Sequence, residues 1–464
     1  MKRSAAFAFA ALLCGAVSLK AQSGSQAVVE GPLGIRVDSA LRALESQGMS
    51  GTFLVRKNGA TLLQKGYGLA IRNPRTPFTP DIATQIGSCT KDFTAVAILQ
   101  LAQRGKFALT DKITRWFPEA PADKRAITVA QLLDHTAGFE EYSGGDFDAV
   151  TREQFSAHLM ASKLRSAPGA EEHYSNPGYG LLAVIIEKMS GTSYDEYLRD
   201  AIITPLGLTH TGFLLPHFDR ARVSRGYNAG GEESIIIEKA HAADGPYWNL
   251  RGNGGMLSTV AEMQTFYDAL FGGETLVSFA ARGQRFAPNG AVGLAGGDMT
   301  HFFLYERDPQ KGTSIIIATN NAAFSGPKVR MPIEIVLGNR TAMPAGAPGG
   351  AANVPAAKLP DTPAGAAFAR YMEAFNSGDT TKMLAFFTEH LAPNPQGPTT
   401  AQRIANYRRI FEHIGPITPR SVSSPDANSI AVTTRNRDGE TVTIGITVEP
   451  SGAHRIVGVR ITAG

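Results

Sequence analysis

The chain has 464 residues, of which 43% are hydrophobic and 19% are charged, a composition typical of a globular protein with room for a large core and a second domain. Lysine and arginine together number 45 against 41 aspartates and glutamates, and no run of five like charges occurs, so nucleic acid is excluded as a partner. The chain has 2 cysteines, which excludes a disulfide-rich scaffold.

Residues 1–21 have the layout of a secretory signal peptide. Lys2 and Arg3 precede an apolar stretch that runs to Leu19, and small and polar residues follow it. A membrane anchor is the alternative, but spanning a bilayer takes about 20 apolar residues and this stretch is shorter. No later segment has eighteen consecutive apolar residues, so we expect no membrane span after cleavage. The protein is then exported from a bacterial cell, to the periplasm or the extracellular space.

Residues 22–340 are expected to form one large domain with strands at both ends and helices between them. The segments that show these patterns are, in chain order, a helix over 37–44, strands over 52–55 and 60–63 around the turn pair Asn58-Gly59, helices from 92 to about 270, and strands over 302–305 and 314–318. This order predicts an α+β fold in which one antiparallel sheet is built from both ends of the domain and a helical subdomain lies beside it.

Residues 341–363 are rich in proline, glycine and alanine and predict an extended linker. Residues 364–464 predict a small separate α+β domain. Phe368, Met372 and Phe375 share one helical face, and apolar residues then alternate from Ile430 onward, as in strands.

Ser88 and Lys91 form an S-x-x-K motif at the start of a predicted helix. The spacing puts both side chains on one helix face, where a neutral amine can accept the proton of the hydroxyl. The motif alone is weak, because a chain of this length contains about one copy by chance, and Ser325 and Lys328 form a second. Pro327 disfavours the second copy, since a helix cannot run through it.

A second motif, Tyr174-Ser175-Asn176, precedes a predicted apolar helix over 181–189. In one interpretation Asn176 caps this helix and Tyr174 is a half-buried aromatic. In the other, a nearby ammonium lowers the pKa of the Tyr174 phenol, which then accepts the serine proton. Tyr247-Trp248-Asn249 matches the same pattern, so the motif alone does not decide between them.

Taken together and in this order, the motifs resemble the serine β-lactamase superfamily. The segments that carry the resemblance are Ser88 to Lys91, Leu132 to Gly138, Tyr174 to Asn176 and Gly254 to Thr259. They are most similar to the branch that holds class C β-lactamases, penicillin-binding esterases and D-peptidases, over about residues 32–338.

The resemblance implies a β-lactamase/transpeptidase-like fold and an acyl-enzyme serine hydrolase acting on a small-molecule ester, amide or peptide. Ser88 would be the nucleophile, and Lys91 and Tyr174 would share the proton transfer, with the choice of base open. Asn176 would orient the substrate and Lys91. The resemblance implies no cofactor, and no histidine, cysteine or acidic cluster has the spacing of metal ligands.

The family's third motif, K-T-G or H-x-G, is altered here to Gly293-Leu294-Ala295-Gly296-Gly297, so Leu294 replaces the cation or imidazole. The backbone N–H of Gly297 can still pair with that of Ser88 as an oxyanion hole, which needs no side chain. Capture of a substrate carboxylate is weakened, so we expect neutral esters or small amides in preference to D-peptides or β-lactams. Arg251 or Asn176 could replace the missing anion contact.

A non-catalytic binding or regulatory protein on the same fold is the rival interpretation. Against it stands the cost of holding a polar cluster in a buried site without use. Three other residues have reactive side chains, but a structural role is the favoured interpretation for each. Cys89 is expected to be a small buried side chain, His135 a turn histidine bonded to backbone, and His301 a strand histidine with a structural hydrogen bond.

Residues 364–464 are similar to the small cone-shaped domains of the nuclear transport factor 2-like superfamily, most clearly at 374–379. Such domains serve as ligand pockets, dimer interfaces or appendages, and the resemblance does not choose among these roles. The oligomeric state stays open for the same reason.

Overall fold

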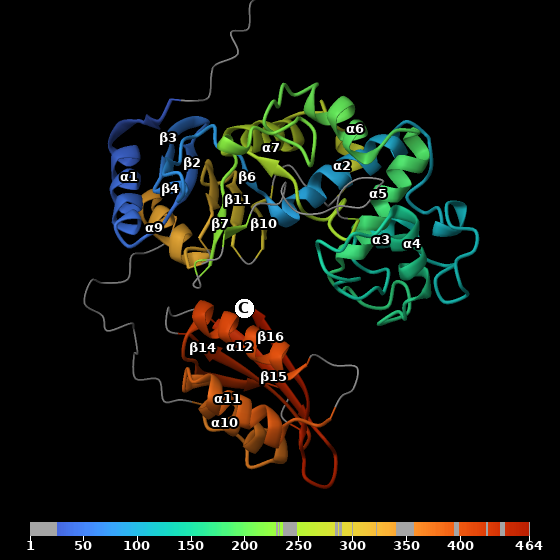
Figure 1. The fold of residues 1–464 in the computed structure, drawn as a ribbon, viewed down its shortest axis with the longest axis vertical. Helices are drawn as coiled ribbons and strands as arrows, with labels where there is room; N and C mark the ends of the chain where they lie inside the picture. The colour runs from blue at the N-terminus through green and yellow to red at the C-terminus, as the bar shows by residue number, and fades with distance from the viewer. Residues whose placement is uncertain are drawn as a thin grey trace, which may run out of the picture. The chain divides into compact units, whose positions relative to one another are not determined.

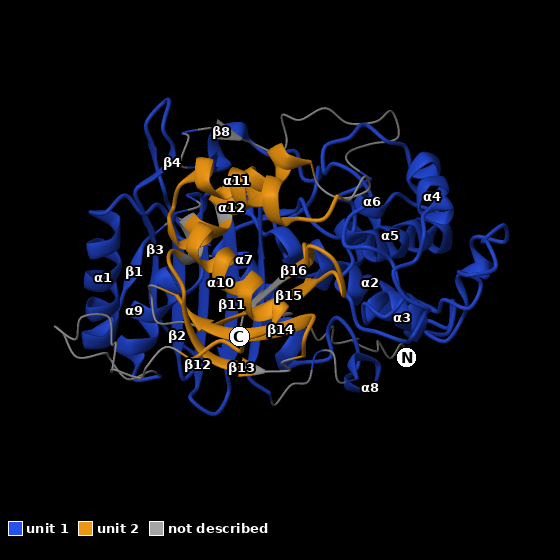
Figure 2. Ribbon diagram, turned by 90° about the horizontal axis from the view of Figure 1, so that it is seen from below, with its two compact units in different colours: residues 1–339 blue, residues 340–464 orange. Residues whose placement is uncertain are grey.

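The structure is a computed structural model that describes residues 26–228, 231, 233–234, 248–283, 286, 290–298, 300–321, 323–339, 357–393, 399–423, 426–436 and 441–463. The predicted signal peptide, linker residues 341–356 and Tyr247 lie outside the described residues. The chain divides into two compact units, Met1–Asn339 and Arg340–Gly464, coloured separately in Figure 2.

In unit 1 a six-stranded antiparallel sheet has the order β1-β3-β2-β12-β11-β10 within the described part of the chain (Figure 1). Its strands are β1 (Val28–Val29), β2 (Gly51–Lys57), β3 (Ala60–Tyr67), β10 (Val292–Gly297), β11 (Phe302–Asp308) and β12 (Thr313–Thr319). β12 pairs with β2, with Ile316 opposite Leu54, and so joins the two ends of the unit. The predicted antiparallel sheet built from both ends is confirmed.

Helices α1 (Gly31–Glu45) and α9 (Pro327–Leu337) pack against each other and against one face of this sheet. Val37 and Leu41 of α1 are fully buried there with Ile317 of β12. α9 begins at Pro327, where a proline fits the first helical turn, so Ser325 lies outside the helix. The second S-x-x-K copy therefore does not share a helix face, as predicted.

The other face of the sheet and the helical subdomain share the largest core. The helices are α2 (Thr90–Gln103), α3 (Val129–Leu133), α4 (Arg152–Ala161), α5 (Asn176–Ser190), α6 (Tyr194–Leu198), α7 (Val260–Gly272) and α8 (Phe279–Arg282), with short turns η1 (Gly87–Cys89), η2 (Ile113–Arg115), η3 (Arg199–Ile203) and η4 (Arg220–Arg222). Capping boxes at Thr128, Thr151 and Ser193 start α3, α4 and α6.

Three short strand pairs lie outside the six-stranded sheet in the described part of unit 1. They are β4 (Leu69–Ile71) with β5 (Thr76–Pro77), β6 (Thr84–Gln85) with β9 (Leu257–Ser258), and β7 (Gly226–Tyr227) with β8 (Glu233–Ser234). The β6–β9 pair matters most for the site, because β6 leads directly into η1 and α2.

In unit 2 helices α10 (Pro363–Asn376), α11 (Thr380–His390) and α12 (Thr400–Ile414) precede an antiparallel sheet. Its strands, in spatial order, are β13 (Thr418–Ser423), β14 (Ser429–Arg435), β15 (Thr441–Val448) and β16 (Ile456–Ala463). Phe368 and Phe375 of α10 pack with Ile444 and Ile446 in a core of their own. Neither α12 nor β13 was predicted from the sequence.

Strand β16 is present, but its apolar residues do not all face the core of unit 2. Val457 is 55% exposed, whereas Ile456 beside it is buried. A register shift between Thr447 and Val448 reverses the alternation at this point, which a period-2 reading of the sequence cannot anticipate.

None of the described helices has the length and apolar character needed to cross a membrane.

Candidate active site

Ser88 lies on the turn η1, between β6 and the first residue of α2. Two glycines let β10 approach this turn closely. A Cβ on Gly87, whose φ is +50°, would lie 2.1 Å from the backbone N of Gly297, and a Cβ on Gly296 would lie 2.4 Å from the backbone N of Ser88. Only glycine at both positions permits this contact, which brings the backbone amides of Ser88 and Gly297 to the same place.

The hydroxyl of Ser88 contacts both predicted partners. Its Oγ lies 2.6 Å from the phenol oxygen of Tyr174 and accepts a hydrogen bond from Nζ of Lys91 at 3.2 Å. Tyr174 comes from the loop just before α5, 86 positions along the chain from the serine. The structure therefore brings together the three side chains that the sequence analysis assigned to the chemistry.

Lys91 is buried and its amine has two further acceptors. Nζ donates to Oδ1 of Asn176 at 2.7 Å and to the backbone carbonyl of Asn253 at 2.7 Å. The Asn176 contact was expected. The Asn253 contact was missed because a backbone acceptor leaves no side-chain signature, although Asn253 directly precedes the Gly254 to Thr259 motif.

Burial sets the ionisation of this cluster. Loss of hydration lowers the pKa of Lys91 to about 7, against its ordinary value of 10.5. Burial also raises the pKa of Tyr174, to about 12. The expectation that Tyr174 has a lowered pKa is therefore wrong, because burial disfavours the charged phenolate, and the nearby amine, with a pKa of about 7, is only about half protonated at neutral pH.

The start of α5 differs from the prediction in one residue. Ser175 is the N-cap, its Oγ accepting from the N–H of Gly178 at 3.3 Å, and Asn176 is the first helical residue. The Asn176 side chain is thereby free to face Lys91. His135 has a φ of +56° and its Nδ1 accepts from the N–H of Ser175 at 3.1 Å, so it is the backbone-bonded turn histidine that was predicted.

The third motif forms β10, with Leu294 opposite Tyr305 of β11. Leu294 packs against the main core and brings no charge to the strand. Beyond Gly297, Asp298 accepts hydrogen bonds from the backbone N–H of Thr300 and of His301. Burial alone would raise the pKa of Asp298, but the hydrogen bonds from His301 and Thr300 outweigh it and hold that pKa well below its usual range.

His301 lies at the end of the β10–β11 turn, not within a strand, and is buried and hydrogen-bonded as predicted. Cys89 is buried, and burial raises the pKa of its thiol well above the ordinary value, so it stays protonated. Arg251 is buried with Nη1 3.4 Å from Oε1 of Glu187, so its charge is committed within the helical subdomain.

A loop over residues 140–148 lies beside the cluster. The backbone carbonyl of Glu141 accepts the N–H of Asn176 at 3.1 Å, and Tyr142 is 59% exposed. Asn249 fixes the loop, its Nδ2 donating to the carbonyl of Gly145 at 2.8 Å. Burial and the charge of Asp298 raise the pKa of Asp146, which also interacts electrostatically with Lys91.

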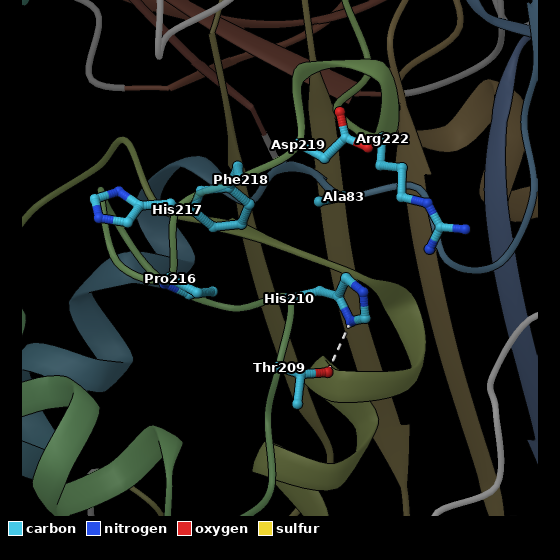
Figure 3. A pocket seen from close by; sticks show the side chains of 8 residues that line it. All are labelled: Ala83, Thr209, His210, Pro216, His217, Phe218, Asp219 and Arg222. Carbon is cyan, nitrogen blue, oxygen red and sulfur yellow. Dashed lines mark hydrogen bonds between the residues drawn. The ribbon is translucent and has the colours of Figure 1, made fainter.

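A separate depression of about 180 Å³ involves none of the predicted site residues. The side chains that line it are drawn in Figure 3. Its lining residues are Ala83, Thr209, His210, Pro216, His217, Phe218, Asp219 and Arg222. Two of its side chains already have partners, Arg222 with Asp81 at 3.0 Å and His210 with Glu262 at 3.1 Å. The described residues contain no group of three or more histidine, cysteine or acidic side chains arranged to hold a metal ion.

A buried lysine bonded to a serine at the start of a helix, with a tyrosine on the other side of the hydroxyl, defines the serine hydrolases of the β-lactamase/transpeptidase-like type. The beta-lactamase family profile matches residues 37–336, and the chain belongs to that family.

Curated relatives are bacterial. Penicillin-binding protein 4* of Bacillus subtilis (strain 168) is 26% identical over 286 residues, which are 58% of this chain and 62% of that protein. Protein flp of Staphylococcus aureus (strain COL) is 31% identical over 194 residues, 40% of this chain and 39% of that protein. The chain thus spans less than two thirds of the length of these relatives.

Solved structures agree on the fold. D-amino acid amidase from Ochrobactrum anthropi SV3 is 25% identical with a TM-score of 0.56, covering 66% of this chain and 98% of that one. A class C beta-lactamase is 20% identical with the same TM-score of 0.56, covering 66% of this chain and 97% of that one.

Proposed function

We propose that this protein is an exported serine hydrolase that works through an acyl-serine intermediate on neutral esters or small amides. The observation that carries the proposal is the contact of the Ser88 hydroxyl with both Lys91 and Tyr174, at 3.2 and 2.6 Å. A non-catalytic role would leave the desolvated Lys91 amine without a compensating use.

Lys91 is the base in this proposal. Its neutral amine takes the Ser88 proton as Oγ attacks the carbonyl carbon, and the carbonyl π electrons move to the oxygen, which becomes an oxyanion. The backbone N–H groups of Ser88 and Gly297 receive that oxyanion. The oxyanion electrons then re-form the carbonyl as the bond from carbon to the leaving group breaks, and Tyr174 gives that group a proton and regains one from protonated Lys91. Water then attacks the acyl-Ser88 ester, which releases the acid and restores the Ser88 hydroxyl.

The proposed preference for uncharged substrates follows from the charges near Ser88, where the third-motif cation is missing and carboxyl groups are present. Leu294 supplies no cation, and Asp298 stays ionised next to Gly297. Asp146 adds a second carboxyl near Lys91. A substrate carboxylate would meet these groups in a partly desolvated site, at a cost of roughly a few kcal/mol, or about a hundredfold or more in kcat/KM.

The same carboxyls favour a second candidate substrate, the amide of an amino acid. Its ammonium group would be attracted by Asp146 and Asp298, and the D-amino acid amidase of Ochrobactrum anthropi is similar to this chain over two thirds of its length. D-peptidase and β-lactamase activity are less favoured, since both need a carboxylate contact that Leu294 does not offer.

The test compares substrates by kcat/KM. Hydrolysis of p-nitrophenyl acetate or butyrate should be measurable, and nitrocefin and D-Ala-D-Ala peptides should be turned over at least about a hundredfold less efficiently. Hydrolysis of D-phenylalanine amide tests the second candidate substrate, the amide of an amino acid. Leu294→His should raise activity toward anionic substrates relative to neutral ones. Nitrocefin hydrolysis comparable to ester hydrolysis in the wild type would contradict the proposed preference.

A further inference from the structure

A buried network of polar side chains lies where the segment before β11 meets β6. At its centre is His301, which is 2% exposed. Its Nδ1 lies 3.2 Å from Nε2 of Gln85, and its Nε2 lies 3.3 Å from Oγ of Ser224. Ser224 donates in turn to Oγ1 of Thr84 at 3.0 Å. The proton transfer proposed above uses none of these side chains.

Nδ1 of His301 also lies 3.0 Å from Oγ1 of Thr300, which donates to Oδ1 of Asp298 at 2.8 Å. The result is one connected network of hydrogen bonds that begins and ends on β6, at Gln85 and Thr84, with the His301 ring as its central link.

This network joins the two segments that carry the proposed oxyanion N–H groups. Gln85 stands three residues before Ser88, and His301 stands four residues after Gly297. Gly87 and Gly296, which meet at the contact itself, have no side chains that could interlock and fix the separation of the two backbones. The contact between Gln85 and His301 is a direct side-chain bridge between them.

The ring and the turn are held in place around this bridge. A Cβ on Gly226 would lie 2.7 Å from Cε1 of His301, so the strand β7 packs directly against the imidazole. The carboxylate of Asp298 accepts the backbone N–H of His301 at 2.7 Å and fixes the turn. The position of the ring is therefore transmitted to the backbone that follows Gly297.

We propose that His301 is a positioning residue for the oxyanion hole, which through Gln85 holds the N–H groups of Ser88 and Gly297 at the separation that a tetrahedral oxyanion requires. The inference rests on the proposed function. His301 touches no reacting atom. Because an oxyanion hole acts on the transition state, its loss should lower kcat and leave KM nearly unchanged.

Two variants break the bridge from its two ends, His301→Leu and Gln85→Met. Each should lower kcat for p-nitrophenyl acetate by about 10- to 100-fold with little change in KM, and the double variant should lose little more than the worse single variant. His301→Asn should recover much of the loss, because its amide can still form a hydrogen bond with the Gln85 amide. His158→Gln, at an exposed position on α4, is the matched histidine control.

A second readout does not depend on the amount of folded enzyme. The ratio of kcat/KM for an ester to that for the matching thionoester reports on the oxyanion hole, since sulfur is a larger and weaker hydrogen-bond acceptor than oxygen. The wild type should favour the oxygen ester strongly, and both bridge variants should shrink that ratio. A merely structural role for His301 would lower activity on both esters equally.

The outcomes separate the two proposals. If a fluorophosphonate does not phosphonylate Ser88 in the folded wild type, the proposed function fails and this inference fails with it. If Ser88 is phosphonylated but the bridge variants keep the wild-type ester-to-thionoester ratio, only the role of His301 is overturned.

Discussion

Lys91 is the residue whose surroundings decide the chemistry. Its amine is buried, which lowers its pKa to about 7, and it has acceptors in Ser88, Asn176 and the Asn253 carbonyl. A lysine at its ordinary pKa would be charged at neutral pH and could not take a proton. The same burial raises the pKa of Tyr174 to about 12, which suits a proton donor rather than a base.

This difference predicts the pH dependence of the reaction. Protonated Lys91 cannot act as the base, so kcat/KM for a neutral ester should fall about tenfold per pH unit below about 7 and level off above it. The measurement is a pH profile of kcat/KM for p-nitrophenyl acetate, corrected for spontaneous hydrolysis. If kcat/KM stays at its plateau value from pH 7 down to pH 5, a lysine base is ruled out.

The contacts of the serine hydroxyl predict non-additive mutations. Lys91→Ala and Tyr174→Phe should each lower kcat heavily, and the double variant should lose little more than the worse single variant, because the two groups act in one proton relay. Tyr197→Phe, a buried tyrosine of α6, is the control and should change kcat much less. Strictly additive losses would count against a shared relay.

For single residues, the sequence predicted which side chains form the site better than it predicted their burial and hydrogen-bond partners. Ser88, Lys91, Tyr174 and Asn176 could be grouped from the resemblance of several motifs taken in order, although neither short motif was sufficient alone. The carbonyl of Asn253 was missed, and the pKa of Tyr174 was predicted in the wrong direction. Both depend on how deeply the cluster is buried, which is a property of the folded protein and not of a motif.

At the scale of elements, the site depends on the contact between η1 and β10. Gly87 and Gly296 permit that contact, and the turn from β10 to β11 fixes its far side. The sequence placed β10 correctly and identified its glycines, but it could not show that Gly296 meets the nucleophile turn. It also named Asn176 as the cap of α5, because serine and asparagine both cap well and only the fold selects Ser175.

The glycine contact predicts a selective loss of activity. In Gly296→Ala the new methyl group would lie 2.2 Å from the carbonyl oxygen of Ile86, so β10 and η1 must separate. We expect a destabilisation of about 1–3 kcal/mol and a loss in kcat of about a hundredfold or more. Gly293→Ala is the matched control on the same strand, since its Cβ would meet nothing within 4 Å. Equal losses in the two variants would contradict this account.

At the scale of the whole molecule, the chain has two units with separate cores. All the residues assigned to the chemistry lie in unit 1, and the core of unit 2 is built from its own helices and sheet. The general plan of unit 1 was predictable from its hydrophobic periodicity. Helix α12 was not, because its apolar positions are sparse, and the resemblance of unit 2 to nuclear transport factor 2-like domains stays a prediction.

The separate cores predict that damage to one unit leaves the chemistry of the other intact. Phe368→Ala removes a fully buried ring from α10 and should destabilise unit 2 by about 3–5 kcal/mol. Calorimetry should show the transition of unit 2 shifted down, while kcat for an ester at temperatures below that transition stays within about twofold of the wild type. A parallel loss of kcat would show that unit 2 supports the site.

The central claim is that Ser88 is a nucleophile that becomes acylated. Treating the full-length protein with an activated fluorophosphonate and measuring its intact mass should show one adduct, and peptide mapping should locate it on Ser88. Ser88→Ala, treated in the same way, should show none. An adduct on another residue such as Ser325, or no adduct on the folded wild type, would contradict the account.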